Sequence, residues 1–82
     1  DVREPHEREI CRILGDVAIP LGELPRRHGE LGSERPLIVY CRSGRRSYEA
    51  CRILAEKGIE GINLRGGILG WIDEVDPSLK KY

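Results

Sequence analysis

The chain has 82 residues with a formal net charge of zero, and charged side chains make up 34% of it. A chain of this length builds one small core, so we expect a single domain over residues 1–82 and no broad basic surface for nucleic acid. No apolar run approaches the roughly 20 residues of a membrane-spanning helix and no signal-peptide pattern opens the chain, so a membrane partner is not expected either.

The first quarter of the chain predicts two short strands around a helix. Residues 1–4 predict the end of a first strand, and Pro5 fits the first position of a helix that runs to residue 11. Ile10 and Ile13 are expected to face the core. Residues 17–19 form a short apolar run before a proline, which predicts a second strand.

A helical stripe and a central strand follow. Leucine or histidine recurs at positions 21, 24, 28 and 31, which predicts a helix with Pro25 near its beginning. Residues 33–36 predict a loop. The apolar run from Leu37 to Tyr40 predicts a buried strand.

The segment after the central strand predicts the longest helix, over residues 47–57. Its expected core face carries Ala50, Cys51, Leu54 and Ala55. Residues 59–64 predict a further strand, and residues 69–75 predict a helix that ends before Pro77. The alternation of strands and helices predicts an α/β fold with a parallel sheet and helices on both faces.

Cys41 lies where the central strand passes to the long helix, and it is the candidate nucleophile. Backbone N–H groups at such a junction have no partners inside the helix, so they can hold an anion such as a thiolate. Arg42, Arg45 and Arg46 add positive charge, which is expected to lower the pKa of this cysteine. In parallel sheets, ligands bind at the carboxyl ends of the strands, where Cys41 lies.

The other two cysteines have separate predictions. Cys51 is expected to be a core residue, whereas Cys11 is either a core residue or a partner thiol for Cys41. The three cysteines include no Cys-x-x-Cys pair, so neither a disulfide framework nor a metal site is expected. An odd cysteine left free suits a reducing, cytoplasmic compartment.

Three ordered motifs carry a family resemblance. The run from Cys41 to Arg46 resembles the Cys-x-x-Gly-x-Arg active-site loop of rhodanese-like domains. Asp1-Val-Arg3 looks like the Asp-x-Arg element of that family, and Gly66 to Trp71 is similar to its Gly-Gly-x-x-x-Trp signature. The resemblance implies a three-layer fold with a central parallel sheet of about five strands, the first of them cut short here. The chain is therefore expected to be a fragment of a longer protein.

The resemblance also implies a sulfurtransferase without a metal or organic cofactor. Cys41 would take a sulfane sulfur from a small donor, thiosulfate or a protein persulfide, and hold it as a persulfide. The implied loop residues that bind substrate are Arg42, Ser43, Gly44, Arg45 and Arg46. The implied supporting residues are Asp1, Arg3 and Trp71.

Loop length separates this chemistry from that of a related family. Four residues lie between Cys41 and Arg46, whereas the similar cell-cycle phosphatases use Cys-x5-Arg to surround a phosphoryl group. The shorter loop suits a single persulfide sulfur, so phosphatase activity is disfavoured.

A narrower resemblance concerns the acceptor. The run from Gly66 to Tyr82, with residues 1–6 and 19–24, looks like the rhodanese-like domain fused behind molybdopterin-synthase or thiamine-pathway adenylyltransferases. It implies that sulfur passes to the C-terminal glycine of a ubiquitin-like sulfur-carrier protein. Two alternatives stay open: a free-standing thiosulfate sulfurtransferase and a non-catalytic rhodanese-like interaction module.

Overall fold

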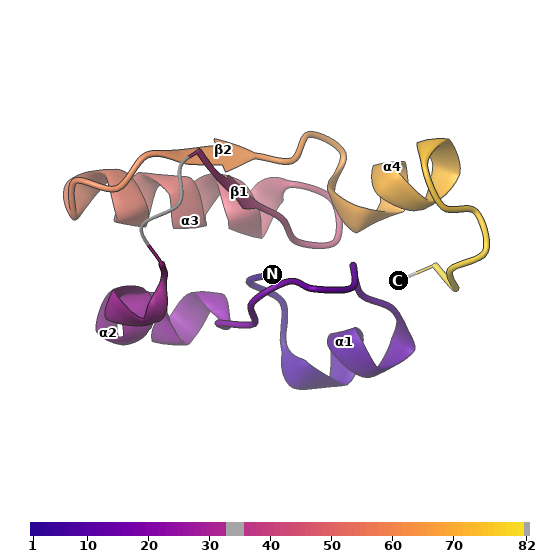
Figure 1. The fold of residues 1–82 in the computed structure, drawn as a ribbon, viewed down its shortest axis with the longest axis horizontal. Coiled ribbons are helices and arrows are strands. Elements are labelled where there is room, and N and C mark those ends of the chain that lie inside the picture. Colours follow the sequence, from indigo (N-terminus) through magenta and orange to yellow (C-terminus); the bar gives the residue numbers. More distant parts are fainter. Residues whose placement is uncertain (33–35, 82) are drawn as a thin grey trace.

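The computed structural model describes residues 1–32 and 36–81 of the chain. Within these ranges the helices are α1 (Pro5–Ile10), α2 (Leu24–Arg27), α3 (Arg45–Glu56) and α4 (Gly67–Glu74), with short 3₁₀ helices η1 (Leu21–Glu23) and η2 (His28–Glu30). The strands are β1 (Leu37–Val39) and β2 (Gly61–Asn63). Figure 1 shows α3 running along the two strands, with α4 beyond them and α1 and α2 on the other side of the N-terminal segment. The first three residues of the loop predicted at 33–36 lie outside the described residues.

The sheet is parallel but smaller than predicted. β1 pairs with β2 in the register Leu37 to Gly61, Ile38 to Ile62 and Val39 to Asn63. The described residues contain these two strands rather than a sheet of about five, so that prediction is wrong for this part of the chain. The parallel direction follows from the crossover through α3.

The segments predicted as strands at residues 1–4 and 17–19 are extended but do not form ladders. Val2 N–H donates to Tyr40 O at 3.0 Å, and Ile19 N–H donates to Asp1 O at 3.0 Å. The next donor along the first segment is lost to the sheet, because Arg3 N–H donates to the Asp1 side chain at 3.0 Å instead of to a neighbouring strand. Side-chain hydrogen bonds of this kind compete with strand pairing.

Helices α2 and α3 pack on one side of β1, and α4 packs on the other side at Tyr40, just beyond the end of the strand. Successive residues of an extended chain point to opposite faces, and the two cores follow this alternation. Val39 and Cys41 belong to a core with Leu24 of α2 and with Ala50 and Leu54 of α3. Tyr40 belongs to a second core, with Cys11, Ile68 and Ile72.

The helix predicted over residues 47–57 is confirmed, but α3 begins two residues earlier, at Arg45. Its buried stripe consists of Ser47, Ala50 and Leu54, at the i, i+3 and i+7 spacing of one helical face. Ala55 is exposed, contrary to the prediction. The stripe has therefore rotated toward the start of the helix, which places the Ser47 side chain inside the molecule.

An ion pair joins α1 to the first turn of α3. Glu7 is 3% exposed, and its two carboxylate oxygens accept N–H groups of Arg46 at 2.6 and 2.7 Å. The hydrogen bonds from Arg46 lower the pKa of Glu7 from 4.5 to about 2. Ile10, expected to face the core, is 40% exposed, because Glu7 and Cys11 occupy the inward face of this segment.

The start of α4 supports the loop that follows β1. Ile68 N–H donates to Cys41 O at 2.9 Å and Leu69 N–H donates to Arg42 O at 3.2 Å. These are N–H groups of the first helical turn, which have no partner within α4. Gly67 has a φ of 62°, and a Cβ at this position would lie 2.3 Å from Arg42 O. Only glycine permits this approach of the two backbones.

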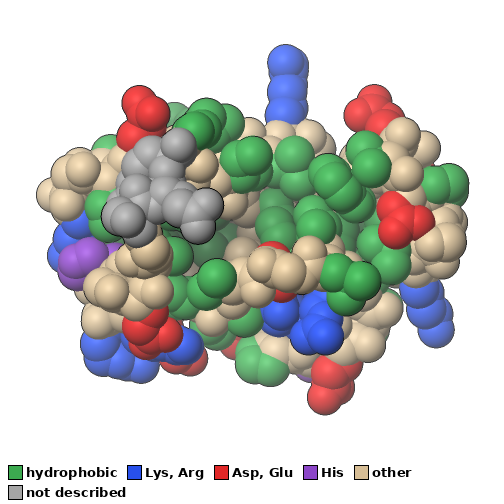
Figure 2. Space-filling model, in the orientation of Figure 1, with side chains coloured by type: hydrophobic (Ala, Val, Ile, Leu, Met, Phe, Trp, Pro, Cys, Tyr) green, Lys and Arg blue, Asp and Glu red, His purple; other side chains and the backbone are tan. Residues whose placement is uncertain are grey.

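An apolar groove crosses the face seen in Figure 2, where hydrophobic side chains gather around a hollow. Its lining includes Val17, Leu31, Ile38, Tyr40 and Trp71. Ile38 is 62% exposed and Val17 is 56% exposed. The groove lies beside β1 and draws its lining from both faces of the strand, since Val39 and Leu54 line it together with Ile38 and Tyr40.

Gly67→Ala is expected to lower the free energy of unfolding by about 3 kcal/mol or more, because the new methyl group adds a backbone clash to an unfavourable φ. The matched control is Gly58→Ala, whose φ is 77° but whose Cβ would meet nothing within 4 Å. That control is expected to cost about 1–2 kcal/mol. Urea unfolding compares the two, and equal losses would show that the contact with Arg42 O is not close.

The Glu7–Arg46 pair is expected to make stability depend on pH in the acid range. Because the folded-state pKa of Glu7 is lowered to about 2, its contribution is present above pH 4.5 and is lost as the pH falls toward 2. Arg46 is 36% exposed, so solvent screening weakens the ion pair. We expect it to contribute about 1–2 kcal/mol to the free energy of unfolding. Denaturant unfolding of the wild type and of Glu7→Gln, at neutral pH and near pH 2, measures this contribution. Parallel acid losses in both proteins would contradict this contribution.

Candidate functional site

Cys41 lies two residues beyond the end of β1, and its sulfur is at the floor of the loop that leads into α3. The residue is 1% exposed. Gly44 N–H donates to Cys41 Sγ at 3.0 Å, and the Ser47 hydroxyl lies 3.4 Å from the same atom. The sulfur is therefore buried with hydrogen-bond donors around it, rather than packed among apolar atoms alone.

Two opposing effects act on the pKa of Cys41. Burial raises it, because a charged sulfur loses its hydration. Hydrogen bonds lower it, from the Ser47 hydroxyl and from the backbone amides of Ser47, Gly44 and Ser43, and the resulting pKa lies below the ordinary value of a cysteine. The donors of the loop and of the first turn of α3 thus favour the thiolate.

Gly44 provides the backbone conformation that the loop requires. It precedes α3 with a φ of 112°, in the left-handed region that residues with a Cβ rarely adopt. Its N–H group points back to Cys41 Sγ, and its carbonyl oxygen accepts a hydrogen bond from Asn63 Nδ2 at 3.2 Å. Gly44 is thus held by hydrogen bonds at both its N–H group and its carbonyl group.

Ser47 and Asn63 were not predicted as site residues. Ser47 is fully buried, and its hydroxyl lies close to both Cys41 Sγ and Asn63 Oδ1. One signal was a serine within the apolar stripe of α3. The other was the position of Asn63, which ends the strand parallel to β1, because carboxyl ends of neighbouring parallel strands meet at one edge.

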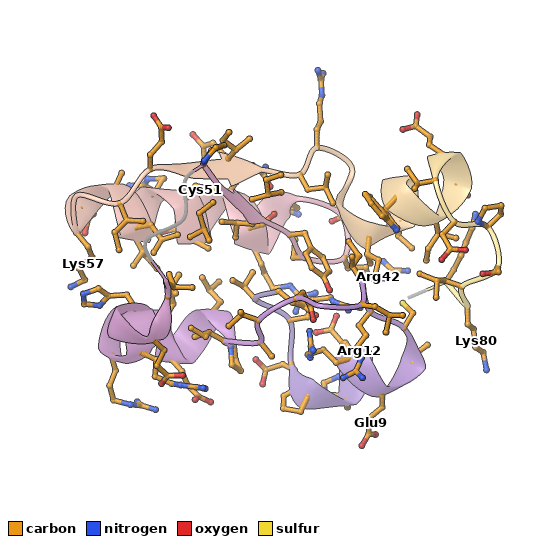
Figure 3. All side chains as sticks on the ribbon, viewed as in Figure 1. Glu9, Arg12, Arg42, Cys51, Lys57 and Lys80 are labelled. Atoms are coloured by element: carbon orange, nitrogen blue, oxygen red, sulfur yellow. The ribbon has the colours of Figure 1, made fainter. Side chains whose placement is uncertain are left out.

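The three arginines of the loop region have different environments. Arg46 directs two N–H groups to Glu7, and its own pKa is raised by these hydrogen bonds and also by the negative charge of Cys41. Arg42 and Arg45 are exposed, as is Ser43 between them. Figure 3 shows Arg42 in the loop between β1 and α3. Arg42 and Arg45 therefore place positive charge on the surface. Arg46 instead joins the start of α3 to Glu7 of α1.

The predicted supporting residues Asp1 and Arg3 form a buried cluster next to Tyr40. Arg3 donates to both carboxylate oxygens of Asp1, at 3.0 and 2.9 Å, and to Cys11 O at 2.7 Å. Its guanidinium lies 5.5 Å from the centre of the Tyr40 ring. The cluster holds the residue that immediately precedes Cys41. Trp71 is half-buried and lines the apolar groove with Tyr40.

The structure does not bring the other two cysteines to Cys41. Cys11 lies in the core on the opposite face of β1. Cys51 lies along α3 away from the loop, as Figure 3 shows, and packs against Gly61 of β2. Cys11 is thus a core residue, and Cys51 is a half-buried one.

Residues 1–32 and 36–81 contain neither a metal-binding cluster nor a membrane-spanning helix. No group of three or more His, Cys, Asp or Glu side chains in these ranges is arranged to hold a metal ion. None of the helices there combines the length and apolar character needed to cross a bilayer.

Comparison with known proteins identifies the family. A model of the rhodanese-like domain matches residues 1–74. A sulfurtransferase of Allochromatium vinosum is 40% identical over 72 residues, which cover 87% of this chain and 67% of that protein. The probable adenylyltransferase/sulfurtransferase MoeZ of Mycobacterium tuberculosis is 33% identical over 85 residues, covering 100% of this chain and 22% of that protein. The crystal structure of a rhodanese-related protein from Thermoplasma volcanium matches with a TM-score of 0.83 at 34% identity, covering 90% of this chain and 74% of that one. The chain therefore belongs to the rhodanese-like domain family.

Proposed function

We propose that this chain is a sulfurtransferase that carries a sulfane sulfur on Cys41 as a persulfide. The observation that carries the proposal is the pair of donors at Cys41 Sγ, the Gly44 N–H at 3.0 Å and the Ser47 hydroxyl at 3.4 Å. Donors in these positions stabilise a thiolate, which is the form of cysteine that attacks sulfur. The sulfurtransferase named among the relatives supports the same class of reaction.

In the first step, the Cys41 thiolate attacks the outer sulfur of thiosulfate or of a protein persulfide. A bond forms between Sγ and the incoming sulfur, and the sulfur–sulfur bond of the donor breaks. Sulfite, or the thiolate of the donor protein, leaves with the electron pair. The lowered pKa of Cys41 increases the fraction of thiolate available near neutral pH.

In the second step, an acceptor removes the terminal sulfur. When a nucleophile attacks that sulfur, the bond to Cys41 breaks and the electron pair returns to Sγ. The Gly44 N–H and the Ser47 hydroxyl face the atom on which this negative charge develops. The Gly44 N–H is already in place and the Ser47 hydroxyl can turn to the sulfur, so both stabilise the leaving thiolate.

The outer surface of the loop is suited to an anionic donor. Cys41 is 1% exposed, so a substrate meets the surface of the loop before the sulfur. In that loop and the first turn of α3, Arg42, Ser43 and Arg45 are exposed. Two guanidinium groups attract thiosulfate by charge, and the hydroxyl of Ser43 adds a donor. The proposed reaction uses neither a metal nor an organic cofactor.

For the acceptor, we propose the C-terminal glycine of a ubiquitin-like sulfur-carrier protein in molybdopterin or thiamine-type biosynthesis. The support is the likeness to an adenylyltransferase/sulfurtransferase over 100% of this chain. With the glycine activated as an acyl-adenylate, the persulfide sulfur attacks the carbonyl and AMP leaves. A thiol then cleaves the resulting sulfur–sulfur bond and releases a thiocarboxylate. A reducing, cytoplasmic compartment, which supplies such thiols, is part of this proposal.

A free-standing thiosulfate sulfurtransferase is the second candidate. It is favoured by the Allochromatium relative, since this chain spans 67% of that protein. The two candidates share the first step and differ in the acceptor. A non-catalytic interaction module is disfavoured, because a structural cysteine gains nothing from donors that lower its pKa.

Cys41→Ser is expected to abolish sulfur transfer from thiosulfate, because serine cannot form a persulfide. Mass spectrometry of the wild type after incubation with thiosulfate is expected to find one added sulfur atom, on the peptide that contains Cys41. The matched control is Cys51→Ser, which removes a thiol that lies away from the loop and should load normally. Addition of a sulfur atom to the Cys41→Ser chain would refute the role of Cys41. The absence of added sulfur in the wild type would refute it as well.

The acceptor is tested with the sulfur-loaded chain, an adenylated sulfur-carrier protein and a thiol reductant. We expect the carrier to gain a thiocarboxylate, seen as the mass change for one oxygen replaced by sulfur. Cyanide in place of the carrier serves as the comparison. Transfer to cyanide without transfer to the carrier would favour the free-standing thiosulfate sulfurtransferase instead.

A further inference from the structure

A closed ring of hydrogen-bonding groups surrounds Cys41, and it includes a side chain from a different element. The Ser47 hydroxyl lies 3.4 Å from Cys41 Sγ and 2.5 Å from Asn63 Oδ1. Asn63 Nδ2 donates to Gly44 O at 3.2 Å, and Gly44 N–H donates to Cys41 Sγ at 3.0 Å. Strand β2 thus contacts the sulfur through a side chain of α3.

The orientation of Asn63 follows from what its neighbours can do. Gly44 O can only accept a hydrogen bond, so the NH₂ group of Asn63 faces it. The amide oxygen of Asn63 then faces Ser47, where it can only accept. Since Ser47 is fully buried, its hydroxyl cannot donate a hydrogen bond to bulk water. It donates within this ring.

The Ser47 hydroxyl has one proton and two acceptors. While Cys41 is a thiol, the hydroxyl donates to Asn63 Oδ1 and its own lone pairs accept the S–H group, so every member of the ring is satisfied. When the thiol loses its proton, Sγ becomes the stronger acceptor. The hydroxyl must then turn to the sulfur and leave Asn63 Oδ1 without a donor, or keep Asn63 and leave the thiolate with one donor fewer. Either arrangement leaves an acceptor unsatisfied.

We propose that Asn63 is a positioning residue that competes with Cys41 Sγ for the Ser47 hydroxyl and thereby sets how readily the thiol ionises. This inference rests on the proposed role of Cys41, but it concerns the acidity of the thiol rather than the fate of sulfur. Asn63 keeps the hydroxyl available beside the sulfur in the resting site. The same competition weakens the stabilisation of the thiolate, which keeps Cys41 basic enough to attack.

Removing the Asn63 side chain is expected to lower the pKa of Cys41, although Asn63 is part of the hydrogen-bonded ring. Asn63→Ala removes the competing acceptor, so the hydroxyl is free to donate to the thiolate and the pKa of Cys41 is expected to fall by about one unit. Ser47→Ala removes the donor, so the pKa is expected to rise. In the double variant, Asn63→Ala has no hydroxyl to release and is expected to shift the pKa little. A residue that merely supports the fold would not make the thiol more acidic when removed.

The other charges near Cys41 stay constant in these variants. Two charged groups with an electrostatic effect on this thiol are Arg46 of α3, which is paired with Glu7 of α1, and the amino group of Asp1. None of them is substituted, and none of them contacts Asn63 in the ring described above. Because the Asn63 variants also lose the donor to Gly44 O, the comparison with and without Ser47 is what assigns a change of pKa to the hydroxyl.

The experiment titrates the ultraviolet absorbance of the thiolate in the intact chain, with the same variant carrying Cys41→Ser subtracted to remove the other cysteines. It needs no sulfur donor, so it is independent of whether the chain transfers sulfur. Asn63→Leu, which keeps the branching of asparagine at Cγ but has no hydrogen-bonding group, is a second variant with the same expected result. Ile62→Ala is the control, since Ile62 is 47% exposed on the same strand.

A fall in the pKa with Asn63→Ala or Asn63→Leu that is lost in the Ser47→Ala background supports the proposal. An unchanged or raised pKa in the single Asn63 variants overturns it. So does a fall of equal size with and without Ser47, or with Ile62→Ala, because each shows that the hydroxyl is not the link.

Discussion

The rest of the structure depends on two opposing effects at the buried sulfur of Cys41: the cost of burying a thiolate and the hydrogen bonds that it accepts. Taking a thiolate out of water costs several kcal/mol, and burial alone would keep Cys41 a neutral thiol. A hydrogen bond to a charged group returns about 1.5–3 kcal/mol, so two or more donors at Sγ offset that cost. The donors here are the Gly44 N–H and the Ser47 hydroxyl, with further help from backbone amides. The donors outweigh burial, so the pKa of Cys41 lies below its ordinary value.

Each neighbouring element holds part of this arrangement. The first turn of α4 donates to the carbonyl groups of Cys41 and Arg42, and Gly67 permits that approach. Arg46 ties the start of α3 to α1 through Glu7. On the opposite face of β1, the ring of Tyr40 lies against the guanidinium of Arg3. The loop is thus fixed from three directions, and its sulfur stays in contact with its donors.

Local pattern predicted much of this, because the features involved are local. The run from Leu37 to Cys41 predicted a strand that ends at the site, and the glycine three residues after Cys41 predicted the tight turn into a helix. Pairings across long separations could not be predicted. Glu7 meets Arg46 from 39 residues away, and Asn63 meets Ser47 only because β2 pairs with β1 in one particular register. The number of strands was overestimated for a related reason: Arg3 uses its backbone N–H for the side chain of Asp1, which no periodicity of residues reveals.

The central claim is that the donors at Cys41 outweigh its burial. The most direct measurement is the pKa of Cys41 in the wild-type chain, taken from the ultraviolet titration of the thiolate with the Cys41→Ser chain subtracted. A midpoint below the value of about 8.5 for a free cysteine is the predicted result. A midpoint above that value would mean that burial dominates, and the loop would then hold a neutral structural thiol.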